Sequence, residues 1–256
     1  MKNKWFKIII SILSLFIMIL ACPVLMRDPI FMDSHERKDP GVFFSSYGDT
    51  GAYKFDSETI LDSLKRGDTN VFALTNESLG THIYKTPFVW KQNDYLLITN
   101  ALHQFVWKET VNDWSLHDMS FFGECGDHIG FDVVKISYAK LTGLQEYSVH
   151  MIGIYPRAGE GEWGGNVKFS RSLFDKWYYI DLEKLKVALE DALQIAEDNG
   201  GEQARLSVNN LCTVDLSLSP YPYPQWNISY SLVPTRIFEI NINAYTAEYE
   251  ILNSKE

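Results

Sequence analysis

The residue types most able to do chemistry gather in one short stretch, ECGDHIGFD, at positions 124–132. Its potential metal ligands are Glu124, Cys125, Asp127, His128 and Asp132. A zinc site needs about four donors converging on the ion at roughly 2.0–2.3 Å. The sequence has no second cluster to complete such a set. We therefore interpret this stretch as a polar loop between strands, and we predict no metal and no cofactor.

Familiar catalytic motifs are missing from the sequence. It contains no Gly-x-Ser-x-Gly elbow, no His-Glu-x-x-His, no phosphate-binding loop and no Cys-x-x-Cys. Gly159, Gly161 and Gly164 match the letters of a dinucleotide-binding fingerprint, but Glu160 and Glu162 between them would repel a pyrophosphate. We interpret this stretch as a glycine-rich turn. The sequence predicts that the protein is not an enzyme.

Two histidines fall on segments that have the pattern of strands, His117 and His150. General acid–base catalysis would need a carboxylate and a cleft beside them. The sequence indicates neither, so we expect both side chains to face solvent.

Three cysteines raise separate questions. Cys22 ends the segment ILAC, which is similar to the lipidation signal of bacterial lipoproteins. Cys125 and Cys212 lie in the body of the chain and form a candidate disulfide if the protein is exported. The alternative is two separate buried thiols.

The segment YPYPQW places two tyrosines among prolines just before a strand. A stiff loop of this kind can present aromatic side chains to a partner protein at a low cost in conformational entropy. Tyr221 and Tyr223 are therefore our candidate partner contacts. The alternative is a proline-rich connection whose aromatic rings cover the edge of the core, and Trp226 after it is expected in the core.

The N-terminus has the pattern of an export signal. Lys2, Lys4 and Lys7 precede a mostly apolar run of about 19 residues, 8–26, close to the ~20 that a membrane-spanning helix needs. Three outcomes stay open: an uncleaved signal-anchor, lipidation at Cys22, or cleavage and release. Each places most of the chain outside the cytoplasmic membrane, and the first two attach it to the cell membrane.

The charge of the chain excludes one class of partner. There are 33 acidic residues against 23 Lys and Arg, which gives a formal net charge of −10. An acidic surface repels the phosphate backbone, so we predict no nucleic-acid binding.

Hydrophobic periodicity suggests one arrangement used twice. In the first copy, a helix over residues 94–108 precedes strands over 115–122, 131–141 and 145–155. In the second copy, a helix over 181–201 precedes strands over 204–219, 225–232 and 236–245. A short helix over 57–66 is expected before them. We predict a helix followed by a three-stranded antiparallel sheet, twice, with one polar face on each sheet.

The second copy resembles the PepSY and PepSY-like domains of protease propeptides and cell-envelope proteins. The resemblance rests on ALEDALQIAEDNGG, WNISY and IFEININAYTAEYEI, within residues 181–252, and is fainter over 93–165. Ala247 and Asn243 stand where the family commonly has glycine and aspartate. The resemblance implies binding, such as inhibition of a protease, and supplies no catalytic residues.

Together these observations predict an α+β protein with two PepSY-like units. The predicted segments are a signal-anchor helix or lipoprotein signal (1–26), a flexible spacer (27–55), a first unit (56–166) and a second unit (167–256). The expected role is non-catalytic binding or modulation of an envelope protein, with a protease as one candidate partner. The alternatives are an exported hydrolase with an unrecognised site and a passive part of an envelope complex.

Overall fold

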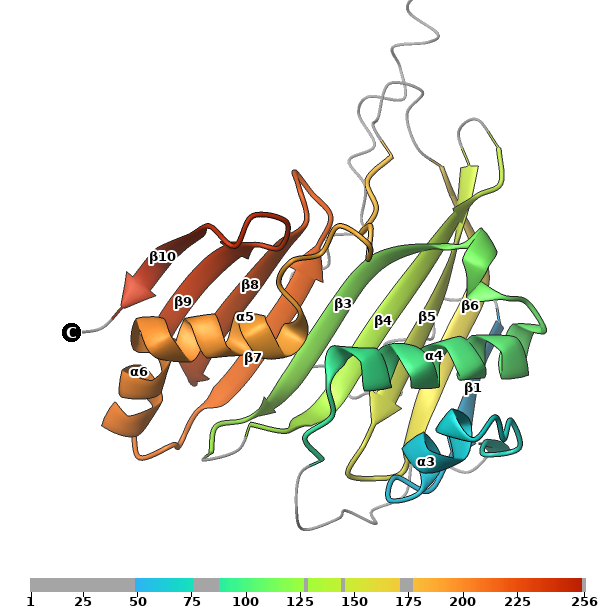
Figure 1. Cartoon of the computed structure of the whole chain (residues 1–256), viewed down its shortest axis with the longest axis horizontal. Coiled ribbons are helices and arrows are strands. Elements are labelled where there is room, and N and C mark those ends of the chain that lie inside the picture. Colours follow the sequence, from blue (N-terminus) through green and yellow to red (C-terminus); the bar gives the residue numbers. More distant parts are fainter. Residues whose placement is uncertain (1–48, 76–87, 127–128, 144–145, 171–176, 255–256) are drawn as a thin grey trace, which may run out of the picture.

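The computed structural model describes residues 49–75, 88–126, 129–143, 146–170 and 177–254. Ten strands in these ranges form one antiparallel sheet in the order β10-β9-β8-β7-β3-β4-β5-β6-β1-β2 (Figure 1). The strands are β1 (Asp49–Lys54), β2 (Ala73–Thr75), β3 (Ser115–Glu124), β4 (Phe131–Leu141), β5 (Glu146–Tyr155), β6 (Glu160–Ser170), β7 (Thr213–Ser219), β8 (Gln225–Leu232), β9 (Thr235–Asn243) and β10 (Tyr249–Ser254).

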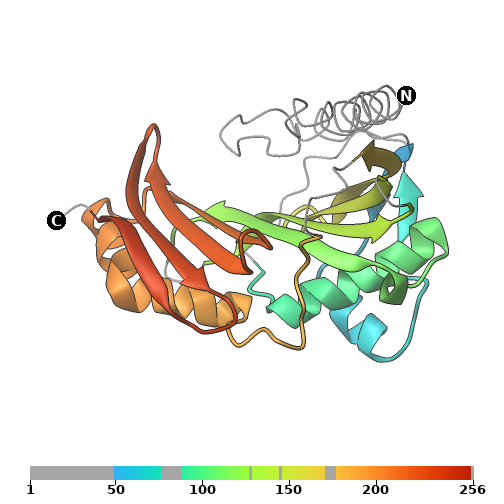
Figure 2. The ribbon, with the colours of Figure 1, turned by 90° about the horizontal axis from the view of Figure 1, so that it is seen from above.

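The helices of the described part pack on one face of this sheet (Figures 1 and 2). They are α3 (Ile60–Lys65), α4 (Gln92–Trp107), α5 (Leu189–Ala196) and α6 (Glu202–Ser207), with short turns η2 (Val111–Asp113) and η3 (Glu197–Gly201). We call this side the helix face. The opposite side, on which no described helix lies, is called the open face.

Local sequence explains α4. Tyr95, Ile98 and Leu102 recur at helical spacing and are each fully buried against the sheet. The Asp94 carboxylate accepts a hydrogen bond from the backbone N–H of Lys91 at 3.1 Å and so caps the first turn. The helix ends at Lys108, which has a left-handed φ of 58°. The expected helix over 94–108 therefore differs from α4 only at its ends.

The main core lies between the helix face and the helices. Strand residues alternate, so that Leu216, Ile228 and Ile240 point inward while Asp215 and Asn227 occupy the open face. Trp226 is fully buried, as expected, and its indole N–H donates to the Val187 carbonyl oxygen at 3.0 Å. This bond ties β8 to the segment that leads into α5.

The prediction of two separate three-stranded units is wrong. β3 and β7 pair antiparallel from Met119–Leu218 to Glu124–Thr213, so that every strand belongs to one sheet. Two separate sheets would leave the backbone N–H and C=O groups of both inner edges without partners, and the pairing satisfies them. β6 and β10 extend the expected sets of three strands, and the expected unit boundary at residue 166 falls inside β6.

β6 went unpredicted because its glycines suggested a turn. Only Gly159, with φ of 66°, lies in the turn, and Gly161 and Gly164 are in the strand. The glycines make room for aromatic rings: a Cβ at Gly51 of β1 would lie 2.6 Å from the Trp163 ring, and one at Gly161 would meet the Tyr53 ring. β1 itself begins at Asp49, inside the segment that we expected to be a spacer.

The second expected helix is also different. The chain is helical only from Leu189, and the backbone leaves the helical conformation at Asn199 and Gly200, with φ of −109° and 116°, where the sequence predicted a glycine stop. A further short helix, α6, follows from Glu202. Leu206 and Val208, expected on a strand, therefore lie in α6 and at its C-terminal end.

The expected anchor helix within residues 1–26 lies outside the described residues. In the part of the chain that the structure describes, no helix is both long enough and apolar enough to span a membrane. Over the described residues, the fold is therefore one helix-covered antiparallel sheet in place of the two units that the sequence suggested.

Candidate functional site

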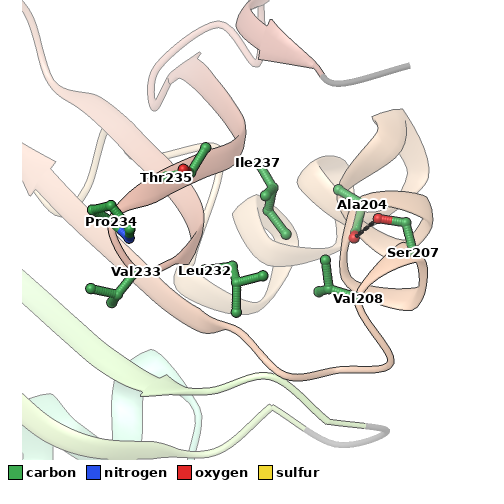
Figure 3. Close-up of a pocket in the computed structure, with 8 residues that line it drawn as sticks. All are labelled: Ala204, Ser207, Val208, Leu232, Val233, Pro234, Thr235 and Ile237. Atoms are coloured by element: carbon green, nitrogen blue, oxygen red, sulfur yellow. Dashed lines mark hydrogen bonds between the residues drawn. The ribbon is translucent and has the colours of Figure 1, made fainter.

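A half-open cavity of about 300 Å³, lined by both apolar and polar atoms, lies between the C-terminal end of α6 and the β8–β9 turn. Figure 3 shows the side chains of Val208 and Leu232 approaching this space from opposite sides. The cavity is lined by Ala204, Ser207, Val208, Leu232, Val233, Pro234, Thr235 and Ile237. The Ser207 hydroxyl donates to the Ala204 carbonyl oxygen at 2.7 Å. Because that hydroxyl is already used, the α6 side of the cavity is suited to apolar groups.

Large aliphatic side chains lie exposed around the cavity. Val233 is 72% exposed and Leu232 42%, both on the β8–β9 turn, and Leu211 is 71% exposed. Thr213 pairs with Ser231, so Leu211 lies at the same end of the β7–β8 ladder as Val233. We call Leu211, Leu232 and Val233 the distal patch. Exposed apolar groups beside a cavity are typical of sites that bind another molecule.

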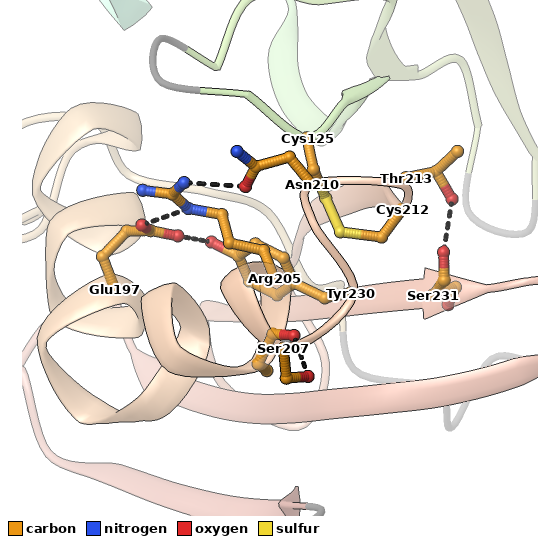
Figure 4. The surroundings of a disulfide bond; sticks show 10 residues. Cys125, Glu197, Arg205, Ser207, Asn210, Cys212, Thr213, Tyr230 and Ser231 are labelled. Carbon is orange, nitrogen blue, oxygen red and sulfur yellow. Dashed lines mark hydrogen bonds and ion pairs between the residues drawn. A yellow bond between two sulfur atoms is a disulfide. The ribbon is translucent and has the colours of Figure 1, made fainter.

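The loop that carries Leu211 is held in place by Arg205, which is only 8% exposed (Figure 4). The Arg205 guanidinium donates to the side-chain oxygen of Asn210 at 3.0 Å and to Glu197 at 2.8 Å. The backbone N–H of Asn210 donates back to the Arg205 carbonyl oxygen at 2.8 Å. Asn209 and Asn210 both have positive φ, 54° and 59°, which asparagine tolerates better than most residues.

Two further links fix this end of the molecule. The Tyr230 hydroxyl of β8 donates to Glu197, and burial, followed by the Glu197 charge, raises the pKa of Tyr230 well above its ordinary value. Cys125 and Cys212 form a disulfide, and the N–H of Cys125 donates to the Cys212 carbonyl oxygen at 2.9 Å. The disulfide joins the end of β3 to the start of β7 (Figure 4).

A row of charged side chains crosses the open face. Strand register places Lys135 of β4, Gly153 of β5 and Glu162 of β6 side by side, and the missing side chain of Gly153 leaves space between the two charges. Glu160 and Glu162 are 3% and 7% exposed. Burial raises the pKa of Glu162 to about 7. The charge of Lys135 opposes this increase in pKa, and the charge of Glu160 adds to it. Burial lowers the pKa of Lys135.

A β-bulge adds two groups near this row. Leu116 pairs with Tyr138 and Asp118 with Ser137, so His117 is the extra residue of β3. The Ser137 hydroxyl donates to Asp118, whose pKa is raised by burial against the opposing effects of His117, Ser137 and Lys135. Within the described ranges, no group of three or more His, Cys, Asp or Glu residues is arranged to hold a metal ion.

The expectation that His150 faces solvent is wrong. His150 is 1% exposed on the helix face, where its Nδ1 lies 2.9 Å from Nε2 of His103 in α4. His103 Nδ1 lies 3.2 Å from the Glu109 carbonyl oxygen, which can only accept. His103 therefore carries its proton on Nδ1, and His150 donates from Nδ1 to His103. Trp107 and Trp114 stack on the two sides of His150, with ring centroids 3.9 and 3.8 Å away.

The residues singled out from the sequence do not come together in one site. Tyr221 and Tyr223 are 58% and 47% exposed on the β7–β8 turn, at the opposite end of the ladder from the distal patch. Of the nine-residue polar stretch, Cys125 is in the disulfide, and positions 127 and 128 lie outside the described residues. Cys22 also lies outside them.

The distal patch was missed because its residues have no chemical motif. The strand expected over 204–219 includes Leu211 and Val208, and Val233 lies between two expected strands. One feature of the sequence could have indicated the patch. The run LVP places two aliphatic residues before a proline in the turn between two strands, where polar residues are usual.

Comparisons with known proteins add no relative to this description. No protein-family model matches the chain, no curated protein matches it, and no solved structure matches it. The resemblance of residues 181–252 to PepSY domains stays a prediction, and the function has to be argued from the geometry.

Proposed function

We propose that the protein is a non-catalytic binding protein of the cell envelope, which holds an apolar segment of a partner protein on its distal patch. One observation carries the proposal: Val233 lines the cavity, Leu211 follows closely on the lining residue Val208, to whose carbonyl oxygen its N–H donates at 3.0 Å, and both side chains are more than 70% exposed. Covering such side chains releases about 25 cal/mol for each Å² of apolar surface removed from water.

The rigidity of the patch supports the same role. The Leu211 loop is fixed by Arg205 and by the disulfide, and Val233 lies in a turn of four residues closed by the Leu232–Thr235 pair. Anchor residues that are already ordered lose little conformational entropy on binding. The cavity beside them has room for one apolar side chain of the partner.

The proposed location is outside the cytoplasm. A disulfide such as Cys125–Cys212 persists in oxidising compartments and is rare in cytosolic proteins. The N-terminal lysines and the apolar run over 8–26 favour the same location. A protease is the partner class that the PepSY resemblance suggests. The net charge of −10 disfavours nucleic acid as a partner.

A photo-crosslinking experiment in native membranes tests the proposal. The crosslinking amino acid benzoylphenylalanine is placed at Val233 in the full chain and, as a control, at Leu74, a 62% exposed aliphatic residue of β2. We expect one dominant protein adduct at position 233 and none at position 74. A second comparison uses Val233→Asp, which should abolish recovery of that protein, and Leu74→Asp, which should not.

Equal labelling at positions 233 and 74, or recovery of the same protein with Val233→Asp, would contradict the proposal. If the recovered protein is a protease, its activity is measured with and without the full chain. Inhibition that Val233→Asp removes would establish modulation.

The charged row gives a second candidate, an exported hydrolase. A carboxyl group with a pKa of about 7 can serve as a general acid or base near neutral pH, and Glu162 has that property. Hydrolysis of ester or peptide substrates by the purified chain that Glu162→Gln abolishes, and Glu250→Gln leaves intact, would favour this function over binding.

A further inference from the structure

The exposed tyrosines of the described part are confined to one end of the sheet. Tyr179, Tyr221, Tyr223 and Tyr249 are 46%, 58%, 47% and 50% exposed. They come from the segment before α5, the β7–β8 turn and the start of β10, which are separate in the sequence. The distal patch, at the other end of the β7–β8 ladder, is aliphatic and contains no aromatic residue.

Strand register shows that these positions lie at the same level. At one end of β1, Asp49 pairs with Gly165 of β6. At the same level, His150 of β5 pairs with Tyr138 of β4, and Tyr138 pairs with Leu116 of β3. The β7–β8 turn lies at this end of the sheet. Ile180 donates its N–H to the Leu116 carbonyl oxygen at 2.9 Å, which brings Tyr179 to the same edge. Figure 1 shows the β7–β8 turn and the start of the segment that leads to α5 at the upper end of the sheet.

We propose that this tyrosine end lies against the surface of a lipid bilayer. Tyrosine suits the membrane–water interface because its ring is apolar and its hydroxyl keeps a hydrogen bond to water or headgroups. Leu141 at the end of β4 and Leu182 after Tyr179 are also exposed at this end, 41% and 43%. Apolar side chains beside tyrosines suit the boundary between headgroups and hydrocarbon.

Contacts join the segments that carry the exposed tyrosines. The rings of Tyr178 and Tyr221 meet edge to face with centroids 5.0 Å apart. The Tyr245 hydroxyl accepts a hydrogen bond from the N–H of Asp181 at 3.0 Å. Asp181 also forms an ion pair with Lys184 at 2.7 Å, so that the positive charge of Lys184 balances the negative charge of Asp181. Attraction by aromatic side chains does not require a basic patch.

The course of the chain supplies the second argument. β1 begins at Asp49 at the tyrosine end, so residues 1–48, with their apolar run at 8–26, enter the fold there. In a chain attached to the membrane by its N-terminal segment, this end of the sheet is therefore the one nearest to the bilayer. The inference rests on the membrane location within the proposed function, but not on the distal patch.

The test uses the full chain in vesicles of phosphatidylcholine, with benzoylphenylalanine at Tyr179 or Tyr223 and, as controls, at Leu211 or Val233. Lipid adducts are measured by mass spectrometry of the purified protein after illumination. We expect several-fold more lipid adduct at the two tyrosine positions than at the two controls. Addition of phosphatidylglycerol should not increase it, since the net charge of −10 provides no attraction to anionic lipid.

The outcomes separate this inference from the proposed function. If the chain floats with the vesicles and positions 179 and 223 give no more lipid adduct than the controls, the orientation is wrong and the location stands. If the chain does not float, the membrane location fails as well. In native membranes, protein adducts at position 223 in place of lipid would identify the tyrosine end as a protein interface and overturn the inference.

Discussion

Glu162 shows how the fold changes the chemistry of a single carboxyl group. It lies 7% exposed on the open face, where burial raises its pKa to about 7. The folded state therefore holds a proton on Glu162 at pH values where the unfolded chain, with a pKa of 4.5, has lost it. The contribution of this group to stability is fully present below pH 4.5 and is lost as the pH rises through about 7.

Glu162→Gln should remove that pH dependence, because glutamine resembles the protonated acid and does not ionise. We expect the variant to gain stability relative to the wild type as the pH rises from about 4.5 to about 7. Urea denaturation across this range measures the difference. The exposed Glu250→Gln serves as the control, and a difference for Glu162→Gln that does not change with pH would contradict the buried-acid interpretation.

The pair of His103 and His150 provides a second residue-level prediction. His150→Phe keeps a ring between Trp107 and Trp114 but removes the N–H that His103 Nε2 accepts. We expect a loss of about 1–3 kcal/mol in the free energy of unfolding, the usual cost of an unsatisfied buried polar group. His117→Phe is the matched control, since no residue of the described ranges makes a hydrogen bond with His117 Nδ1. An equal loss in both variants would contradict the proposed role.

At the scale of elements, α6 is attached to the sheet through one buried cation. Arg205 binds Glu197 of η3 and Asn210 of the α6–β7 loop, and Glu197 in turn accepts from Tyr230 of β8. These contacts join four segments around one guanidinium. Local sequence could not indicate this, because the contacts of Arg205 and Glu197 join residues on both sides of the helix break at Gly200 with a separate strand.

Arg205→Ala should leave Glu197 buried without its cation, and we expect a loss of about 3–5 kcal/mol in the free energy of unfolding. Arg236→Ala is the control. Arg236 pairs with Glu239 at 2.7 Å, but its side chain is 37% exposed, so its loss should cost about 1 kcal/mol or less. Thermal or urea unfolding of the two variants measures the contrast, and similar losses would show that burial of Arg205 is unimportant.

At the scale of the whole molecule, the centre of the sheet is the junction between the two predicted units. β3 and β7 lie in the fifth and fourth positions of the strand order, while β10 and β2 form its edges. The disulfide at Cys125 and Cys212 closes one end of the same junction across 87 positions of sequence. One continuous sheet places the tyrosine end and the distal patch at opposite ends of a single body.

Hydrogen exchange tests this arrangement. The amides of Met119, Phe121, Leu216 and Leu218 should be among the slowest to exchange, because they open only when the central pairing breaks. The amides of β10 at the sheet edge should exchange much faster. Mass spectrometry of peptides from the two regions provides the measurement, and rapid exchange at β3 and β7 would favour two separate sheets instead.

The sequence by itself determined the elements whose pattern is local. The strands expected over 131–141 and 225–232 coincide with β4 and β8, and the helix over 94–108 differs from α4 by two residues at its start and one at its end. Hydrophobic periodicity identifies such elements because each buries one face of its own. The disulfide partners could be named from the sequence, but their bond depends on the β3–β7 pairing.

Only the tertiary structure decided which faces meet and which side chains are left uncovered. His150 points inward because His103, 47 residues away, lies above it, and the strand position 161 holds a glycine because the Tyr53 ring fills the space where a Cβ would lie. The distal patch and the tyrosine end likewise consist of residues from separate turns. Contacts between residues far apart in the chain settle these features, and no periodicity within one segment records them.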